Sequence, residues 1–272
     1  MYQVLLTIGD FELRSYGVIV AIAILLGVGV AHFMARQYGK FENHVLDMTV
    51  YVVIGAIIGA RLWEVFFFQW GYYSKNLNEI LMIWNGGLSI QGGLVGGFVT
   101  GIWYTRKHKI PFWEFADIVT PGIILGQAVG RIACFLNGDA FGSPTGSSFG
   151  LVYPEGTMAY ATYGSQPLWP AEVMEGQWDL IVFAIVLILS KREMPKGYIF
   201  LTYNILYSFG RFMLEFLRGD TPRYLFNWTA AQWTSMIVIL LALFFMYYLY
   251  TKKSPMNSSK AIAKGKTAKR TK

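Results

Sequence analysis

The chain has 272 residues, of which 54% are hydrophobic, 17% aromatic and only 14% charged, and its mean hydropathy is +0.41. Soluble domains carry about 25% charged residues, so this composition excludes an ordinary soluble protein. The single cysteine excludes a disulfide-rich secreted scaffold, and the abundance of apolar residues excludes a disordered chain. The composition predicts a helical integral membrane protein.

The net charge of +7 comes from the C-terminal segment 251–272, which holds eight Lys or Arg residues and no acid. The rest of the chain has 15 basic and 16 acidic residues, so no nucleic-acid partner is expected. We predict that residues 251–272 form a disordered basic tail and that residues 1–250 form a transmembrane domain.

Seven segments are long and apolar enough, or nearly so, to cross a bilayer, which takes about 20 residues. They are Tyr16–Ala35, Val45–Phe68, Gly86–Tyr104, Phe115–Phe135, Met174–Leu189, Tyr198–Phe216 and Ala230–Tyr250. The fifth is the weakest, because it is continuously apolar only from Leu180 to Leu189. The predicted fold is an all-α integral membrane protein with seven transmembrane helices.

The basic residues between these segments predict the orientation by the positive-inside rule. Sixteen of them follow the first, third, fifth and seventh spans, and only four lie in the opposite loops. We therefore expect an extracytoplasmic N-terminus and a cytoplasmic C-terminus. The long connection 137–173 then lies on the extracytoplasmic side, and connections of this length are often functional.

Three arginines, Arg61, Arg131 and Arg211, stand inside apolar segments. A charge at the centre of a bilayer costs about 2.5–3.5 kcal/mol on insertion scales, so such residues face the protein interior and have partners. Glu64 stands three residues after Arg61, so a local ion pair and a functional role are equally good explanations for that arginine.

Arg211, Glu215 and Arg218 fall on one stripe of the sixth predicted helix, near its outer end. Two arginines around one glutamate leave a surplus positive charge, and a guanidinium group suits phosphate because it donates two parallel hydrogen bonds. Arg131 ends the fourth helix at the same outer level. The three arginines predict a phospholipid headgroup site in the outer leaflet, with ion pairing inside the protein as the alternative.

Glycines are concentrated in the third and fourth predicted helices. The third has seven, and the fourth has Gly122, Gly126 and Gly130 at four-residue spacing. Small residues at this spacing let helix backbones approach closely in lipid. Gln91, among the glycines of the third helix, is then most simply a polar packing residue. No metal-ligand spacing occurs in the sequence, so neither a metal nor a cofactor is expected.

Five sequence motifs, in order along the chain, resemble the bacterial prolipoprotein diacylglyceryl transferase family. The most specific is GRIACFLNGDAFGSPT, Gly130–Thr145. The others are LTIGDFELRSYG at Leu6–Gly17, GGLSIQGGLVG at Gly86–Gly96, PAEVME at Pro170–Glu175 and GRFMLEFLRGD at Gly210–Asp220. The resemblance extends over nearly all of the chain except the tail.

The resemblance implies a reaction that the residue pattern alone does not reveal. Members of this family transfer diacylglyceryl from phosphatidylglycerol to the lipobox cysteine thiol of a secreted precursor, forming a thioether and releasing glycerol-1-phosphate. The nucleophile is the substrate's thiol, so Cys134 need not act. The implied partners are phosphatidylglycerol, prolipoproteins and membrane lipid, and the implied location is the bacterial cytoplasmic membrane.

The resemblance also implies roles for individual residues of this chain. The arginines would bind the phosphate and offset charge on the leaving group. Asn137 and Asp139 would hydrogen-bond the headgroup glycerol, and Gly142 would let the outer loop lie close to it. Glu215 would hold the arginines, and Tyr16 would orient lipid or thiol. The expected site consists of Tyr16, Gln91, Arg131, Asn137, Asp139, Gly142, Arg211, Glu215 and Arg218.

The sequence departs from the family pattern at four positions. The family usually has histidine at Gln91, asparagine at Cys134, glutamate at Asp139 and glutamine at Glu172. Glutamine cannot take a proton from a thiol, so a family base would be vacant here or moved to a carboxylate such as Glu172 or Asp139. Alternatively, the arginines alone lower the pKa of the thiol and no base is required.

Two other functions compete with the transferase. A lipid- or lipoprotein-binding scaffold that kept the site but lost its chemistry would explain Gln91 and Cys134. A small-solute or ion transporter would explain polar residues inside spans. The sequence shows no internal repeat, however, and its polar groups gather near one face instead of crossing the membrane.

Overall fold

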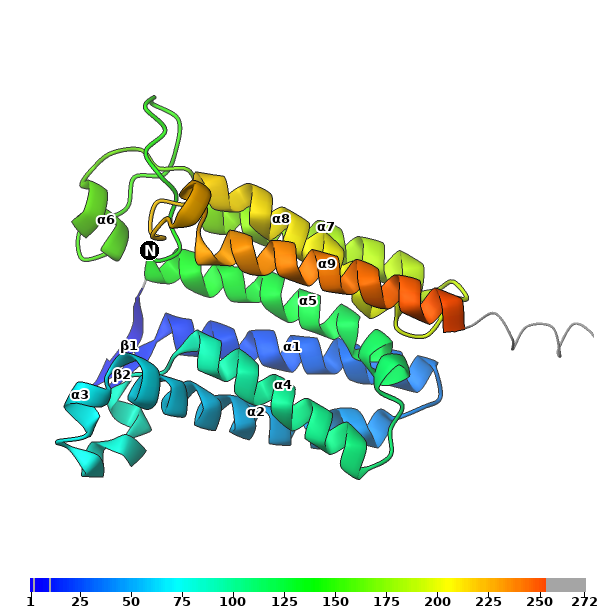
Figure 1. Cartoon of the computed structure of the whole chain (residues 1–272). Coiled ribbons are helices and arrows are strands. Elements are labelled where there is room, and N and C mark those ends of the chain that lie inside the picture. Colours follow the sequence, from blue (N-terminus) through cyan, green and yellow to red (C-terminus); the bar gives the residue numbers. More distant parts are fainter. Residues whose placement is uncertain (2, 10, 253–272) are drawn as a thin grey trace, which may run out of the picture. The chain divides into compact units, whose positions relative to one another are not determined.

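The computed structural model describes residues 1, 3–9 and 11–252, most of which are helical (Figure 1). They form two compact units. Unit 1 comprises residues 1–27 and the described chain from residue 120 onward, and unit 2 comprises residues 28–119. The boundary falls inside two helices, α1 (Ser15–Gln37) and α5 (Phe112–Asn137). The predicted tail lies, from residue 253 onward, outside the described residues.

Each of the seven predicted spans corresponds to a helix, and the predicted ends are close to the observed ones. Besides α1 and α5, these helices are α2 (Glu42–Trp63), α4 (Ile90–Lys107), α7 (Ala171–Ser190), α8 (Tyr198–Leu214) and α9 (Ala230–Lys252). Five are long and apolar enough to cross a membrane; α4 and α8, with 18 and 17 residues, are the two shorter ones. The count of seven crossings therefore stays a prediction.

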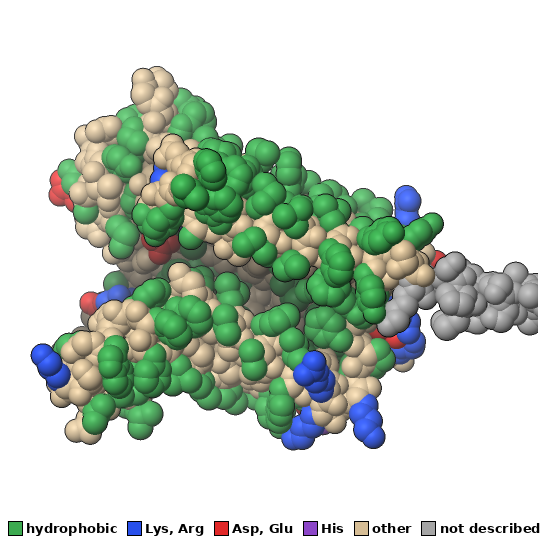
Figure 2. Space-filling model, viewed as in Figure 1, with side chains coloured by type: hydrophobic (Ala, Val, Ile, Leu, Met, Phe, Trp, Pro, Cys, Tyr) green, Lys and Arg blue, Asp and Glu red, His purple; other side chains and the backbone are tan. Residues whose placement is uncertain are grey.

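Unit 2 is built on a close contact between α2 and α4. Gly55 and Gly59 of α2 face Gly92 and Gly96 of α4, and a Cβ atom at any of the four would overlap atoms of the opposite helix. This confirms the prediction that glycines of the third span allow close packing, and it identifies α2 as the partner. Lys and Arg side chains gather at the end of this unit where α4 ends (Figure 2).

Short elements connect α2 to α4. They are a π-helical turn at Glu64–Phe68, α3 (Trp70–Tyr73) and two 3-10 turns at Leu77–Leu81 and Ile83–Asn85. Gly86 and Gly87 follow with φ values of 84° and 71°, in the left-handed region that favours glycine. This connection ends at Ser89, whose backbone N–H donates to the carbonyl of Ala60 at 3.1 Å.

Arg61 at the end of α2 holds this connection, and the alternative of a local ion pair with Glu64 is wrong. The buried guanidinium donates only to backbone carbonyls in the described part of the chain, and Glu64 instead accepts from Gln69 at 2.7 Å. Its acceptors are the carbonyls of Glu79 (2.5 Å), Gly86 (2.7 Å), Ile80 (2.8 Å), Gly87 (2.9 Å) and Met82 (3.3 Å). These carbonyls lie in 3-10 turns and left-handed glycines, where no regular ladder satisfies them.

Unit 1 has its hydrophobic core between α5, α7 and α8. Ile124, Val182, Val186, Ile199 and Tyr203 are buried together there. Helix α9 packs along α8, and hydrophobic side chains cover much of the visible face of these two helices, as expected for a surface in lipid (Figure 2). Glycines again set a close helix contact, because a Cβ at Gly27 of α1 would lie 2.7 Å from the carbonyl oxygen of Gly122 of α5.

A β-hairpin that the sequence analysis did not predict precedes α1. Its strands, β1 (Val4–Ile8) and β2 (Phe11–Arg14), pair antiparallel. The side-chain amide of Gln3 donates to the carbonyl of Asn137 at 2.9 Å, so the start of the chain is tied to the end of α5.

The connection 138–170 has a small core of its own, made by Phe141, Tyr153, Ala159 and Leu168. It contains one short helix, α6 (Met158–Tyr163), whose N-cap Thr157 accepts a hydrogen bond from the backbone N–H of Tyr160. Single β-bridges tie it together, between Pro144 and Leu168 and between Leu151 and Leu168. The long polar-rich connection is therefore a folded element on unit 1.

Candidate active site

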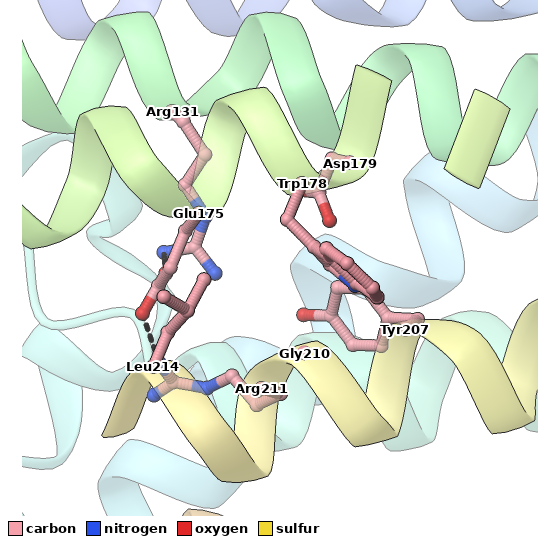
Figure 3. A pocket seen from close by; sticks show the side chains of 8 residues that line it. All are labelled: Arg131, Glu175, Trp178, Asp179, Tyr207, Gly210, Arg211 and Leu214. Atoms are coloured by element: carbon pink, nitrogen blue, oxygen red, sulfur yellow. Dashed lines mark hydrogen bonds and ion pairs between the residues drawn. The ribbon is translucent and has the colours of Figure 1, made fainter. Parts of the chain in front are cut away.

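Glu175, in the second turn of α7, is the centre of a cluster of ion pairs in unit 1 (Figure 3). Its side chain is 4% exposed, and guanidinium groups from α5 and from both sides of the end of α8 meet on it. Arg131 Nη1 lies 2.6 Å from Oε2 of Glu175 and Arg218 Nη1 lies 3.3 Å from Oε1, which also accepts from Arg211 Nη1. The predicted convergence of the three arginines is confirmed.

The charge balance of the cluster differs from the prediction. Arg211 also pairs with Glu215 at 2.8 Å, and Arg218 binds Asp220 through two hydrogen bonds of 2.7 and 2.5 Å. Three arginines thus meet three acids, and the expected surplus of positive charge around Glu215 is wrong. Burial lowers the pKa of Arg218, but its bonds to Asp220 and the charge of Glu175 outweigh this and raise it above the usual value, so Arg218 stays charged.

The predicted helical stripe is wrong at its outer end. Helix α8 stops at Leu214, residues Glu215–Leu217 form a 3-10 turn, and Arg218 has extended backbone angles. The i, i+4 pair of Arg211 and Glu215 survives this change, but Arg218 reaches the cluster from the chain that follows the helix. Its side chain therefore approaches Glu175 from a different direction than a continuous helix would allow.

A small pocket of about 10 Å³ lies beside the ion pairs, with room for about one water molecule. It is lined by Arg131, Glu175, Trp178, Asp179, Tyr207, Gly210, Arg211 and Leu214 (Figure 3). Trp178 is fixed by a hydrogen bond from Nε1 to the carbonyl of Leu206 at 3.0 Å. Gly210 lies directly against this indole, and a Cβ there would overlap it.

The guanidinium groups keep donors for a ligand. In the part of the chain that the structure describes, Arg211 binds both of its carboxylates through Nη1 alone, and Arg131 binds Glu175 through Nη1 alone. The remaining N–H groups of Arg131 and Arg211 have no partner among the described residues. They can form the parallel hydrogen bonds that a phosphate group accepts.

Three more predicted site residues lie in unit 1 near the end of α5: Tyr16, Asn137 and Asp139. The amide of Asn137 donates to Asp139 Oδ2 at 2.6 Å, so these two predicted headgroup ligands are bound to each other. Tyr16, in the first turn of α1, is within electrostatic reach of Asp139 and Arg131. The structure thus brings the predicted tyrosine and the predicted α5 residues together.

Gly142 allows a close contact, but the contact is within the protein. A Cβ at position 142 would overlap the backbone carbonyl of Trp169, which accepts from the N–H of Gly142 at 3.1 Å. Gly142 also pairs with Arg218 as a single β-bridge. This glycine therefore joins the connection 138–170 to the chain that carries Arg218.

Gln91 and Glu172 are two of the four positions at which the sequence departs from the family pattern. Gln91 lies in unit 2, exposed in the first turn of α4, and accepts from the hydroxyl of Ser89 at 2.7 Å. Glu172 in unit 1 is fully buried and accepts a hydrogen bond from the Tyr153 hydroxyl. Burial raises the pKa of Tyr153, and the bond to Glu172 raises it further, so the tyrosine remains a neutral donor.

A family model described as prolipoprotein diacylglyceryl transferase matches residues 3–248. The chain belongs to the prolipoprotein diacylglyceryl transferase family. Similar proteins named phosphatidylglycerol–prolipoprotein diacylglyceryl transferase occur in Acaryochloris marina (37% identical), Nostoc sp. (35%) and Listeria innocua (33%). The matches cover 93% of this chain in all three cases, and 92%, 91% and 91% of the relatives.

Family membership and the five apolar helices together make the chain a multi-pass membrane protein and a transferase. The site of this prolipoprotein diacylglyceryl transferase family member contains three acids that sequence reasoning did not single out: Glu175, Asp179 and Asp220. A signal for the first two was present, because both stand in the fifth predicted span or its opening motif, and acids inside an apolar segment are functional by default.

Proposed function

We propose that this chain transfers the diacylglyceryl group of phosphatidylglycerol to the lipobox cysteine thiol of prolipoproteins. The products are a thioether-linked lipid on the precursor and glycerol-1-phosphate. The names of the relatives state the lipid donor and the protein acceptor, and they give no support to a scaffold without chemistry. The observation that carries the proposal is the convergence of Arg131, Arg211 and Arg218 on Glu175 beside a pocket in a membrane protein.

The arginines supply the electrostatic part of the reaction. The phosphodiester of the lipid takes the free N–H groups of Arg131 and Arg211, and Glu175 keeps the two guanidinium groups in place before the lipid binds. As the bond between carbon and the phosphate oxygen breaks, the leaving phosphate gains negative charge. Donors already aimed at that position are worth about 2.7–4 kcal/mol each.

The other site residues position the two substrates. Asn137 and Asp139 hydrogen-bond the headgroup glycerol, and Tyr16 orients lipid or thiol. Gly142 and Glu215 act through their neighbours, Gly142 by holding the connection 138–170 close and Glu215 by holding Arg211. Gln91 serves as a polar contact at the start of α4.

We infer the following membrane topology. Seven helices cross the bilayer, with the N-terminus outside, the C-terminus in the cytoplasm and the connection 137–173 outside. Residues 1–250 constitute the catalytic domain, and the basic residues from 251 onward stay cytoplasmic in a bacterial cytoplasmic membrane. The excess of basic residues in the loops on one side supports this orientation. Reporter fusions at the C-terminus and in the 191–197 loop test it, since both should report the cytoplasm.

The function is tested with purified protein, phosphatidylglycerol labelled in its headgroup, and a synthetic lipobox peptide. We expect release of labelled glycerol phosphate together with a peptide whose mass has increased by the diacylglyceryl group. Cys134→Ala should retain activity within about threefold, because the nucleophile is the substrate's thiol. A peptide with serine in place of its cysteine should release nothing. Absence of product under conditions in which a relative is active would reject the proposal.

A further inference from the structure

Asp179, on α7, is a buried acid that the ion pairs leave out. It stands one helical turn after Glu175, which pairs with all three arginines, and the residue is 2% exposed. Within the described residues Asp179 forms neither a hydrogen bond nor an ion pair, and its Oδ2 is completely buried without a partner. Buried polar groups are nearly always hydrogen-bonded, so this exception needs an explanation.

The unpartnered carboxyl lines the same pocket as the free donors of Arg131 and Arg211 (Figure 3). Its neighbours in that pocket come from three helices: Arg131 from α5, Glu175 and Trp178 from α7, and Tyr207 and Arg211 from α8. A group that bound only within the protein would have found one of these partners. The carboxyl instead lines a pocket that Arg131 and Arg211, the proposed phosphate ligands, also line.

A thiol reacts as its thiolate, so the proposed reaction has to remove the thiol proton, and a base at the site would take it. Gln91 has no basic atom. The carboxylate of Glu172 already accepts from Tyr153, and that of Asp139 accepts from Asn137. Of these three carboxylates, only that of Asp179 lines the pocket without a donor of its own.

We propose that Asp179 is the catalytic residue that accepts the proton of the lipobox thiol. This inference rests on the proposed function. The S–H bond breaks and its proton passes to a carboxylate oxygen of Asp179. The sulfur electron pair forms a bond to the glyceryl carbon, and the bond from that carbon to the phosphate oxygen breaks with its electrons on the phosphate. The proton then leaves Asp179 for the departing phosphate or for water, which restores the carboxylate.

Charges around the pocket suit this role. Arg131 and Arg211 line the pocket from two helices, and their positive charges reduce the cost of a negative charge on Asp179. Glu175, on the same helix as Asp179, is itself negative and disfavours that charge. Tyr207 is the remaining titratable group in the pocket. A carboxyl between such opposing influences can hold and release one proton in each turnover.

The test compares Asp179→Asn with Asp179→Glu and with Glu172→Gln as the matched buried carboxyl on the same helix. We expect kcat of Asp179→Asn to fall at least about a hundredfold while KM for phosphatidylglycerol changes little. Asp179→Glu should recover part of the rate. Glu172→Gln should lose less than about tenfold; a loss as large as that of Asp179→Asn would assign the proton to Glu172 and overturn the inference.

A second measurement separates proton transfer from structure. A lipobox peptide with selenocysteine carries a selenol that is ionised at neutral pH, so it needs no base. We expect Asp179→Asn to use this peptide at the wild-type rate, which also shows that the variant is folded. With the thiol peptide, the defect should shrink about tenfold per pH unit from pH 7 toward the thiol pKa of about 8.5.

Three outcomes would overturn the inference: wild-type kcat in Asp179→Asn, an equal defect with thiol and selenol peptides, or a defect that does not change with pH. Failure of the proposed function is distinguishable, because the wild-type protein would then release no glycerol phosphate from either peptide.

Discussion

The two units solve the problem of a buried arginine in opposite ways. In unit 2, Arg61 donates to five backbone carbonyls. In unit 1, among the described residues, Arg131 and Arg211 pair with carboxylates and use one nitrogen each for this. Carbonyls of a folded backbone cannot leave, so Arg61 is a fixed structural element. A carboxylate can share its arginine with a phosphate, and the unused donors make that exchange possible.

The largest expected effect comes from removing an arginine of unit 1. Arg131→Ala and Arg211→Ala should each lower kcat/KM for glycerol phosphate release about 10²–10³-fold, because each removes donors to the leaving phosphate. Glu175 keeps two other arginines in either variant, so thermal unfolding of Arg131→Ala in detergent should change little. Arg211→Ala also takes the ion pair from the fully buried Glu215, so its unfolding temperature should fall. Full activity in both variants would refute the headgroup role.

The next effect concerns the stability of unit 2. Arg61→Gln supplies at most two donors for five carbonyls, and each carbonyl left unsatisfied costs about 1–3 kcal/mol, so we expect a loss of about 3 kcal/mol or more. Arg61→Lys, with three donors, should be intermediate. The free energy of unfolding in mixed micelles measures this. Wild-type stability in Arg61→Gln would show that the carbonyl contacts are not structural.

The smallest effect sharpens the account of packing in unit 2. Gly96→Ala places a methyl group against the carbonyl of Gly55, and the helices must separate, at a cost of about 1–3 kcal/mol. Gly101→Ala on the same helix is the matched control, because its nearest contact would be 3.9 Å away. The same unfolding measurement should show the control unchanged or slightly stabilised, since alanine favours a helix. Equal behaviour of the two variants would contradict the close contact.

The sequence predicts the helices well because apolar length is a property of each segment alone. The sequence does not predict side-chain contacts between residues that are distant along the chain. Helical spacing relates Arg211 to Glu215 but does not reveal Glu175, which comes from another helix, and so the charge count around Glu215 was wrong. The sequence suggested Glu64 as a partner of Arg61 because an acidic side chain can be recognised in a sequence. Every residue has a backbone carbonyl, so the sequence does not reveal which carbonyls lack a hydrogen-bond donor.

The end of α8 shows a second limit. The spacing of Arg211 and Arg218 assumed a helix that continues through position 218, but a 3-10 turn intervenes. The signal was available, because Gly219 and Asp220 follow directly and both residue types are common where helices end. The hairpin at Val4–Arg14 was missed because its strands are short, although Gly9 and Asp10 in the sequence are a residue pair typical of hairpin turns.

The backbone around Gly142 has a mechanical consequence. Ser143 donates to the carbonyl of Leu217 at 2.7 Å and Gly219 to that of Phe141 at 3.1 Å, on either side of the bridge from Gly142 to Arg218. The connection 138–170 cannot move away from the helices without breaking hydrogen bonds next to Arg218, which pairs with Glu175. Displacement of the connection 138–170 would therefore also move Arg218 and change its ion pair with Glu175.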